Sequence, residues 1–192
     1  MDAMKDRDGQ CLLRGIIHIG DAYFGGGLNG RKAGRGSENK IPFVAALELN
    51  DESRPIHLRL NRVSGFASTA IETWSLESLA PGFVVFSDGL ACFRAVAAAG
   101  CVHVPVVIDG RKPKDVSLFQ WLNRFIGNVK TALNGTHHAF DFKKYGDRYL
   151  AEISYRFNRR FYLKGLLQRL ILAGIGCEPQ PERLLRSAEL CC

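Results

Sequence analysis

Three polar residues between positions 88 and 130 have the types and spacing that chemistry at phosphate requires. Asp88 follows an apolar run and precedes a glycine, the position at which open α/β sheets place their ligands. Asn123 and Lys130 are seven residues apart, so two helical turns bring both to one face, with Gly127 between them. Such a face could offer an amide oxygen to a metal ion and an ammonium group to a phosphate.

Each of these residues also has a purely structural interpretation. Asp88 can be a turn aspartate that caps the segment beginning at Leu90. Asn123 and Lys130 can belong to a solvated polar face, which is the commoner origin of such a pair. Asn123 and Lys130 therefore indicate a functional site only in combination with Asp88. Asp109, which also follows an apolar run and precedes glycine, favours a turn.

Length and composition indicate one globular domain with a polyanionic partner. Of the 192 residues, 46% are hydrophobic and 23% are charged, which is ordinary for a globular protein. The 26 Lys and Arg against 19 Asp and Glu give a formal net charge of +7, which favours nucleic acid. No apolar stretch has the length of a membrane span, and the N-terminus lacks the core of a signal peptide. The six cysteines show no metal-type pairing, which favours a reduced, cytoplasmic protein.

The predicted elements follow an order that indicates a fold. Strands are expected at 12–19, 42–49, 56–61, 83–86 and 102–108, and helices at 69–79, 90–99, 118–133, 147–161 and 163–173. Thr69 and Glu72 fit a capping box at the start of the first helix. Four apolar residues form a core-facing stripe on the third: Leu122, Ile126, Val129 and Leu133. This order predicts an α/β protein with a ribonuclease-H-like fold, a mixed five-stranded sheet flanked by helices, plus C-terminal helices.

Six segments of the sequence together resemble one protein family. They are HIGDAYFGG (18–26), GRGSENK (34–40), PFVAALE (42–48), FSDGLACFRAV (86–96), WLNRFIGNVKTALNGTHHAF (121–140) and YLAEISYRFNRRF (149–161). In this order they resemble the ISXO2-like (IS1595-family) insertion-sequence transposases, a branch of the DDE/N superfamily. The resemblance implies a ribonuclease-H-like catalytic domain over 12–161, followed by a helix and a loose tail over 162–192. It also implies that acidic residues bind two Mg²⁺ or Mn²⁺ ions for DNA cleavage and strand transfer.

The resemblance carries roles to individual residues. Asp88 matches the second catalytic aspartate, Asn123 the third catalytic position, and Lys130 the lysine found seven residues later. Asp88 and Asn123 are thereby implied as metal ligands, with Asp21 as a further candidate. His138 matches a histidine of the family's GTxH segment, and its role stays open.

The first catalytic position departs from the family pattern. Family members carry two acidic residues after the first strand, and the first of them binds metal. Alignment on Tyr23, Gly25 and Gly26 places Gly20 at that position and Asp21 beside it. Successive strand residues point to opposite faces, so Asp21 replaces the missing ligand only if a bulge re-aims it. We therefore expect impaired cleavage, and the alternative is a non-catalytic DNA-binding relic of a transposase.

Two basic segments are candidate DNA contacts. The glycine-rich segment after the first strand offers Arg31, Lys32, Arg35 and Lys40. Residues 143–169 hold eight bases, two acids and interleaved aromatics, and Arg156, Arg159 and Arg160 are the candidates there. A solvated loop and an amphipathic helix with core aromatics are the respective structural alternatives.

The resemblance also sets expectations about what surrounds this domain. Full-length family members place a zinc ribbon and a helix-turn-helix region before the catalytic domain, and the sequence shows neither. We therefore expect a transposase catalytic domain in isolation. Its implied partners are DNA, as element ends and target, and a second copy in a homodimer, without membrane association.

Overall fold

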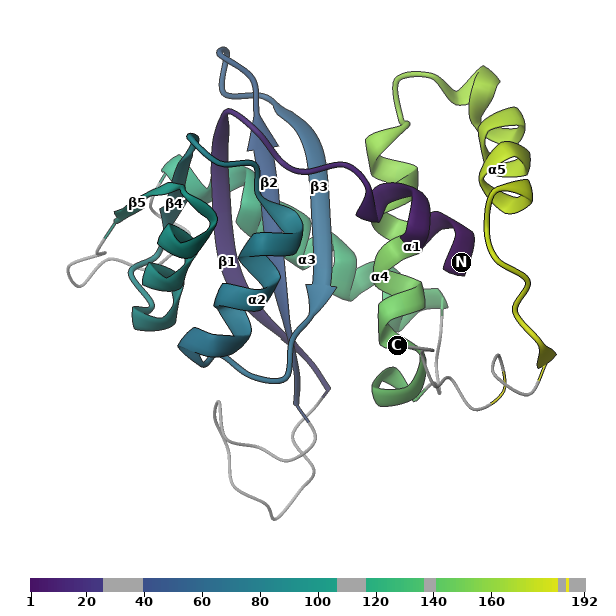
Figure 1. The fold of residues 1–192 in the computed structure, drawn as a ribbon, viewed down its shortest axis with the longest axis horizontal. Helices are drawn as coiled ribbons and strands as arrows, with labels where there is room; N and C mark the ends of the chain where they lie inside the picture. The colour runs from purple at the N-terminus through teal and green to yellow at the C-terminus, as the bar shows by residue number, and fades with distance from the viewer. Residues whose placement is uncertain (26–39, 107–116, 137–140, 183–185, 187–192) are drawn as a thin grey trace.

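One mixed sheet of five strands forms the centre of the molecule, with helices on both of its faces (Figure 1). The computed structural model describes residues 1–25, 40–106, 117–136, 141–182 and 186. The strands are β1 (Ile16–Phe24), β2 (Ile41–Leu49), β3 (Pro55–Arg62), β4 (Val84–Ser87) and β5 (Val102–Pro105). Their order is β3-β2-β1-β4-β5, in which β1 to β3 are antiparallel and β4 and β5 run parallel to β1. This is the ribonuclease-H-like strand order, and the predicted fold class is confirmed.

Helices cover the sheet unequally. In the described residues they are α1 (Asp2–Gly9), α2 (Ser68–Ser78), α3 (Gln120–Thr136), α4 (Phe142–Asn158) and α5 (Leu166–Ile175), with 3₁₀ helices η1 (Ala91–Ala99), η3 (Ser117–Phe119) and η4 (Leu163–Gly165). Helices α2 and η1 cover one face of the sheet, and α3 and α4 the other. Helix α1, which the sequence patterns did not predict, packs on α4, and α5 packs on α1 (Figure 1). No helix in the described part of the chain is long and apolar enough to cross a membrane.

Strand β1 separates two hydrophobic layers because its side chains alternate between the faces of the sheet. Ile17 and Ile19 are fully buried on the side of α2 and η1. Ala22 and Phe24 point to the opposite side, in the cluster that holds the buried residues of α3. The apolar stripe predicted on α3 is confirmed, with three buried members and one half-buried member: Leu122, Val129, Leu133 and Ile126.

Several predicted boundaries are displaced by contacts between distant segments. Strand β1 begins four residues later than predicted and ends five later, because it pairs with β2 along its whole length. Helix α4 begins five residues earlier than predicted. The Asp141 carboxylate accepts a hydrogen bond from the backbone N–H of Lys144 at 3.0 Å and so caps the helix at its true start. Helix α5 begins three residues later than predicted, after the turn η4.

The structure confirms one local helix prediction and contradicts another. The helix predicted at 90–99 is present as the 3₁₀ helix η1. Its buried residues Phe93, Val96 and Ala99 recur every three positions, which is the period of a 3₁₀ helix. The capping box at Thr69 does not form, because α2 already begins one residue before it and no side chain caps the helix.

Candidate active site

Gly20 and Asp88 come together where strand β4 ends. The parallel register of β1 and β4 pairs Ile19 with Ser87 in the last step of that ladder. Gly20 and Asp88 are the next residues of the two segments, so the fold brings the first and second predicted catalytic positions side by side. Asp88 Oδ1 also accepts a hydrogen bond from the backbone N–H of Leu90 at 3.3 Å. Asp88 is therefore both a turn residue and a residue of the candidate site.

The side of the sheet that Gly20 faces is fixed by its neighbours on β1. Ile19 is buried among residues of α2 and η1, so Gly20 faces α3. A Cβ atom at Gly20 would lie 3.0 Å from Leu122 Cδ2 and 3.8 Å from Ile126 Cδ1. The space in front of Gly20 is thus lined by apolar side chains of the helix that carries Asn123.

Helix α3 presents the other two predicted catalytic residues. Asn123 directly follows Leu122, whose methyl group is the nearest atom to the missing Gly20 side chain. Lys130 lies two turns further along the helix, about 10 Å by the helical rise. Both side chains are half-buried. Helix α3, which carries Asn123 and Lys130, thus lies on the side of β1 that Gly20 faces.

Asp21 does not join these residues. The antiparallel register of β1 and β2 runs without a shift through Gly20 paired with Ala45 and Asp21 paired with Val44. No bulge re-aims the strand at this point, so the Asp21 side chain points to the face opposite Gly20. Its neighbour two residues on, Tyr23, contacts Phe66 on that same opposite side.

A buried histidine near the site was missed by the sequence reasoning. His18 lies two residues before Gly20 on the same face, is only 2% exposed, and stands edge-on to Phe86 and Phe119 at 5.6 and 5.5 Å. Its Nδ1 has no hydrogen-bond partner among the described residues. Burial lowers the pKa of His18 to about 4, against a weaker opposing effect of the Leu118 backbone. In the sequence, the sign of such a buried group is a histidine within the apolar segment that forms β1.

A hydrogen bond between neighbouring strands holds the end of β4 that positions Asp88. Ser87 Oγ lies 2.8 Å from His103 Nε2 on β5 and also accepts a hydrogen bond from the backbone N–H of Gly89 at 3.3 Å. Burial lowers the pKa of His103, and the positive charge of Arg94 adds to this effect. Neutral His103 and fully buried Ser87 thus fix the turn from which the Asp88 carboxylate projects.

The donor set around Gly20 does not fit two metal ions. Asp88 offers one carboxylate and Asn123 one neutral amide, whereas Gly20 offers no side chain. The described residues contain no group of three or more His, Cys, Asp and Glu side chains arranged to hold a metal ion. Mg²⁺ prefers hard carboxylate oxygens, and a pair of ions needs more of them than this arrangement supplies.

Two of the three arginines predicted to bind DNA, both just past the end of α4, are committed to contacts within the protein. Arg159 Nη1 forms an ion pair with Asp8 Oδ1 of α1 at 2.7 Å, and its guanidinium lies 3.5 Å from the Tyr155 ring centroid. Arg160 donates to backbone carbonyls of β3 and stacks on an aromatic ring of α4. The Arg156 side chain is 70% exposed, and its ion pair with Glu152, one helical turn earlier, has an N–O distance of 3.4 Å.

The two ends of α4 lie at opposite ends of the sheet. Arg160, just past the C-terminal end, donates to Ile56 at the start of β3, the end at which β1 begins. At the N-terminal end, Phe142 packs on Phe24, the last residue of β1, at 4.2 Å between ring centroids. Seventeen residues of helix separate these ends by about 25 Å.

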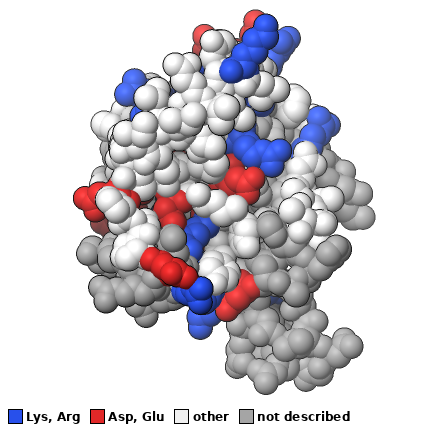
Figure 2. All heavy atoms as spheres, turned by 90° about the vertical axis from the view of Figure 1, so that its right-hand side faces the viewer, with Lys and Arg blue, Asp and Glu red and all other residues white. Residues whose placement is uncertain are grey.

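Exposed cations gather at the N-terminal end of α4. Lys143 and Lys144 are exposed, while Arg62 and Lys40 are half-buried at the adjoining ends of β3 and β2. Arg62 donates to the carbonyl of Lys143, which fixes the start of α4 against β3. The side of the molecule with α1 and α5 shows acidic and basic side chains intermixed instead (Figure 2). The predicted residues Arg31, Lys32, Arg35 and His138 lie outside the described residues.

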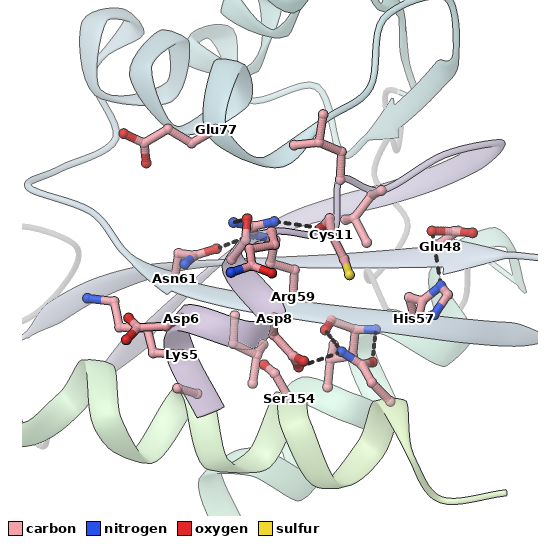
Figure 3. A pocket seen from close by; sticks show the side chains of 18 of the residues that line it. Lys5, Asp6, Asp8, Cys11, Glu48, His57, Arg59, Asn61, Glu77 and Ser154 are labelled. Carbon is pink, nitrogen blue, oxygen red and sulfur yellow. Dashed lines mark hydrogen bonds and ion pairs between the residues drawn. The ribbon is translucent and has the colours of Figure 1, made fainter. Parts of the chain in front are cut away.

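A pocket of about 870 Å³ lies between α1, strands β2 and β3, and α4, separate from the candidate site (Figure 3). The Arg59 guanidinium in it donates to the carbonyl of Cys11 at 2.9 Å. His57 Nδ1 lies 3.3 Å from Glu48 Oε2, and this contact raises the pKa of His57 although burial opposes it. The Ser154 hydroxyl is buried without a partner among the described residues. None of the predicted catalytic residues lines this pocket.

Fold and site together define the class of protein: a ribonuclease-H-like domain with polar residues gathered at the end of β4 and on α3. Residues 12–158 match the family model of the ISXO2-like transposase domain, so the chain belongs to this family and the predicted family is confirmed. Among solved structures the chain is similar to the Mos1 transposase in a paired-end complex with the left transposon end. That likeness has 13% identity and a TM-score of 0.30, and covers 87% of this chain and 58% of the other. A comparison with curated proteins finds no match.

Proposed function

We propose that this chain is an insertion-sequence transposase domain that keeps DNA binding but is impaired in metal-dependent DNA cleavage and strand transfer. Membership of the ISXO2-like family supports the first part of the proposal. The observation that carries the second part is Gly20, which stands beside Asp88 and opposite α3 with no side chain of its own. Asp21 does not compensate, because the regular register of β1 turns it to the other face.

The remaining site residues have distinct proposed roles. Asp88 is the anionic oxygen ligand that the site retains, and Asn123 adds a weaker amide oxygen. Lys130, two turns along α3, suits contact with a phosphate of bound DNA. The metal ions implied for the family, Mg²⁺ or Mn²⁺, would supply charge stabilisation at phosphorus when bound. One carboxylate and one amide hold such ions weakly, which is the physical reason for the proposed impairment.

The proposed DNA contacts follow the exposed cations rather than the total charge. The exposed Lys143 and Lys144 and the half-buried Lys40 lie where β1 ends and β2 begins, on the side to which β1 extends beyond the end of β4. Arg156 remains an exposed candidate at the far end of α4. Arg31, Lys32 and Arg35 of the glycine-rich segment remain part of the proposal on the sequence alone. A cytoplasmic location, where thiols stay reduced, suits a protein that acts on DNA.

A non-catalytic DNA-binding relic is the second candidate function. The contact of Leu122 and Ile126 with the space in front of Gly20 favours it, because apolar side chains line the place of a metal ligand. The two candidates differ in one measurable property. In an impaired enzyme, one restored carboxylate raises metal-dependent cleavage, whereas in a relic it does not.

Nicking of supercoiled plasmid DNA with Mg²⁺ or Mn²⁺ tests the proposal on the natural chain and on Gly20→Asp. A Cβ atom at position 20 requires the Leu122 methyl group, the end of a flexible side chain, to move by a few tenths of an ångström. We expect Gly20→Asp to nick at least about tenfold faster than the natural chain. Gly20→Asn is the matched control, since it has the same size and lacks the charge.

The outcomes separate the two candidates. If the natural chain nicks as fast as Gly20→Asp, the proposed impairment is wrong. If Gly20→Asp folds and binds DNA with unchanged affinity and still does not nick, the chain is a binding relic. Fluorescence anisotropy against increasing salt measures the binding, and loss of affinity with salt is expected for phosphate contacts.

A further inference from the structure

Helix α5 is apolar yet exposed on nearly all sides. Seven of its ten residues are Leu, Ile or Ala, and none of the ten is buried. It stands away from the sheet, with α1 between it and α4 (Figure 1). A helix of this length is marginal in water without tertiary packing, and an apolar helix in a soluble protein is normally covered. In the described part of the chain α1 packs on α5, and this contact leaves most of its apolar surface exposed.

The exposed apolar side chains of α5 and the turn before it form one patch, here called the α5 patch. Its members are between 53% and 82% exposed: Phe161, Tyr162, Leu163, Leu167, Ile171, Leu172 and Ile175. Together they expose on the order of 700 Å² of apolar surface. The largest apolar patch of a typical monomer is smaller, about 300–600 Å², whereas each partner of a standard interface contributes about 800 Å². The α5 patch thus has the area of one half of a dimer interface.

We propose that the α5 patch is the interface between two copies of this chain, which pair their α5 helices antiparallel about a two-fold axis. Leu167, Ile171 and Ile175 follow one another at intervals of four residues along α5 and so form a single row. A two-fold axis near the middle of this row lays the row of one chain against the reversed row of the other. The same patch then serves both partners, as an isologous interface requires.

The charges at the two ends of the α5 patch favour the antiparallel arrangement. Lys164 and Arg169 are exposed near its start, and Glu178 is exposed just past its end, whereas Glu182 is paired with Arg186 at 2.6 Å. An antiparallel pair brings the basic start of one copy beside the acidic end of the other, whereas a parallel pair sets like charges together. Cys177 Sγ donates to Asp6 Oδ2 at 3.1 Å, which ties the end of α5 to α1.

The interface does not depend on the reaction proposed above, because the α5 patch contains no residue of the candidate site. Its failure would leave the proposed transposase chemistry in place. A negative nicking experiment would likewise leave the proposed interface unaffected. The nicking assay measures catalysis, whereas the interface is tested by the molecular mass in solution.

Sedimentation equilibrium and light scattering of the full chain test the interface. We expect a dimer at about 10 μM chain. In Leu167→Glu/Ile171→Glu, four carboxylates meet at the two-fold axis, which should raise the dimer dissociation constant at least about 100-fold. Glutamate is a good helix former and both positions are exposed, so circular dichroism should stay unchanged. The matched control is Leu76→Glu, an equally exposed leucine on α2, which should remain dimeric.

A charge exchange tests the antiparallel direction. Lys164→Glu and Glu178→Lys should each weaken the dimer about threefold, and the double variant should restore it. A double variant that is weaker than either single one overturns the antiparallel arrangement. A natural chain that is monomeric at about 100 μM overturns the interface itself. So does a dimer that survives Leu167→Glu/Ile171→Glu, or a monomer that binds anionic phosphatidylserine vesicles through the α5 patch.

Discussion

The two ends of helix α4 carry similar positive charge but use it differently. At the C-terminal end, Arg159 pairs with Asp8 at 2.7 Å and has a side chain only 12% exposed. At the N-terminal end, Lys143 and Lys144 are exposed. The C-terminal cation therefore holds α1 against the core, while the N-terminal cations remain accessible to a polyanion. The comparison shows that net charge along a segment does not locate a nucleic-acid surface until the internal partners of each cation are known.

Removal of Arg159 should produce the largest change of stability. Arg159→Ala removes the ion-pair partner of Asp8, which keeps a hydrogen bond from Asn158 Nδ2 at 3.0 Å and the longer-range attraction of Arg59. The loss of the ion pair and of the guanidinium contact with Tyr155 should lower the free energy of unfolding by about 2 kcal/mol. Urea denaturation measures this change.

Arg156→Ala is the matched control, since Arg156 lies on the same helix and is 70% exposed. Its free energy of unfolding should change by less than about 0.5 kcal/mol. Equal destabilisation by the two variants would remove the distinction between the internal and the exposed arginine.

The opposite end of α4 should respond through DNA affinity instead of stability. Lys143→Ala/Lys144→Ala removes two exposed cations near the end of β1, so DNA binding should weaken about tenfold at moderate salt. The slope of log affinity against log salt should fall by about two. Anisotropy with labelled duplex DNA measures both quantities, and a normal unfolding curve excludes a folding defect.

The same measurements on Arg159→Ala sharpen the contrast between the ends of α4. At a temperature where this variant is folded, its salt slope should equal that of the natural chain. A lower slope for Arg159→Ala and an unchanged one for the lysine variant would reverse the assignment of the two ends.

The contrast also shows what the sequence could and could not predict. The strand order and the apolar row of α3 follow from local periodicity, and the candidate site follows from residue types at fixed spacing. Helix α1 has no buried residue, and ion pairs of Asp2 and Asp8 with residues about 150 positions away hold it in place. The roles of Arg159 and Arg160 were hidden for the same reason, since their partners lie on α1 and β3. A contact between segments that are distant in the sequence produces no local residue pattern from which it could be predicted.

Gly20 and His18 show the same limit at the candidate site. The absence of a ligand at Gly20 was visible in the sequence, but the Leu122 methyl group that faces it belongs to a helix a hundred residues later. His18 was overlooked because its surroundings, Phe86 and Phe119, come from two other segments. Its lowered pKa is a property of that packing rather than of the strand itself.

The smallest expected effect is a pH dependence at the C-terminal end of α4. The contact with Glu48 raises the pKa of His57, and the negative charge of Asp8 adds to it, whereas burial and Arg160 oppose it. The folded state therefore holds the His57 proton more tightly than the unfolded state. This stabilisation is complete below about pH 6.5, the unfolded pKa, and is lost as pH rises through the folded value. Because the His57 side chain is half-exposed, the loss should be only a few tenths of a kcal/mol. Denaturation curves of the natural chain and His57→Gln between pH 5.5 and 8.5 should converge toward high pH by that amount, and parallel curves would show that the pair contributes nothing.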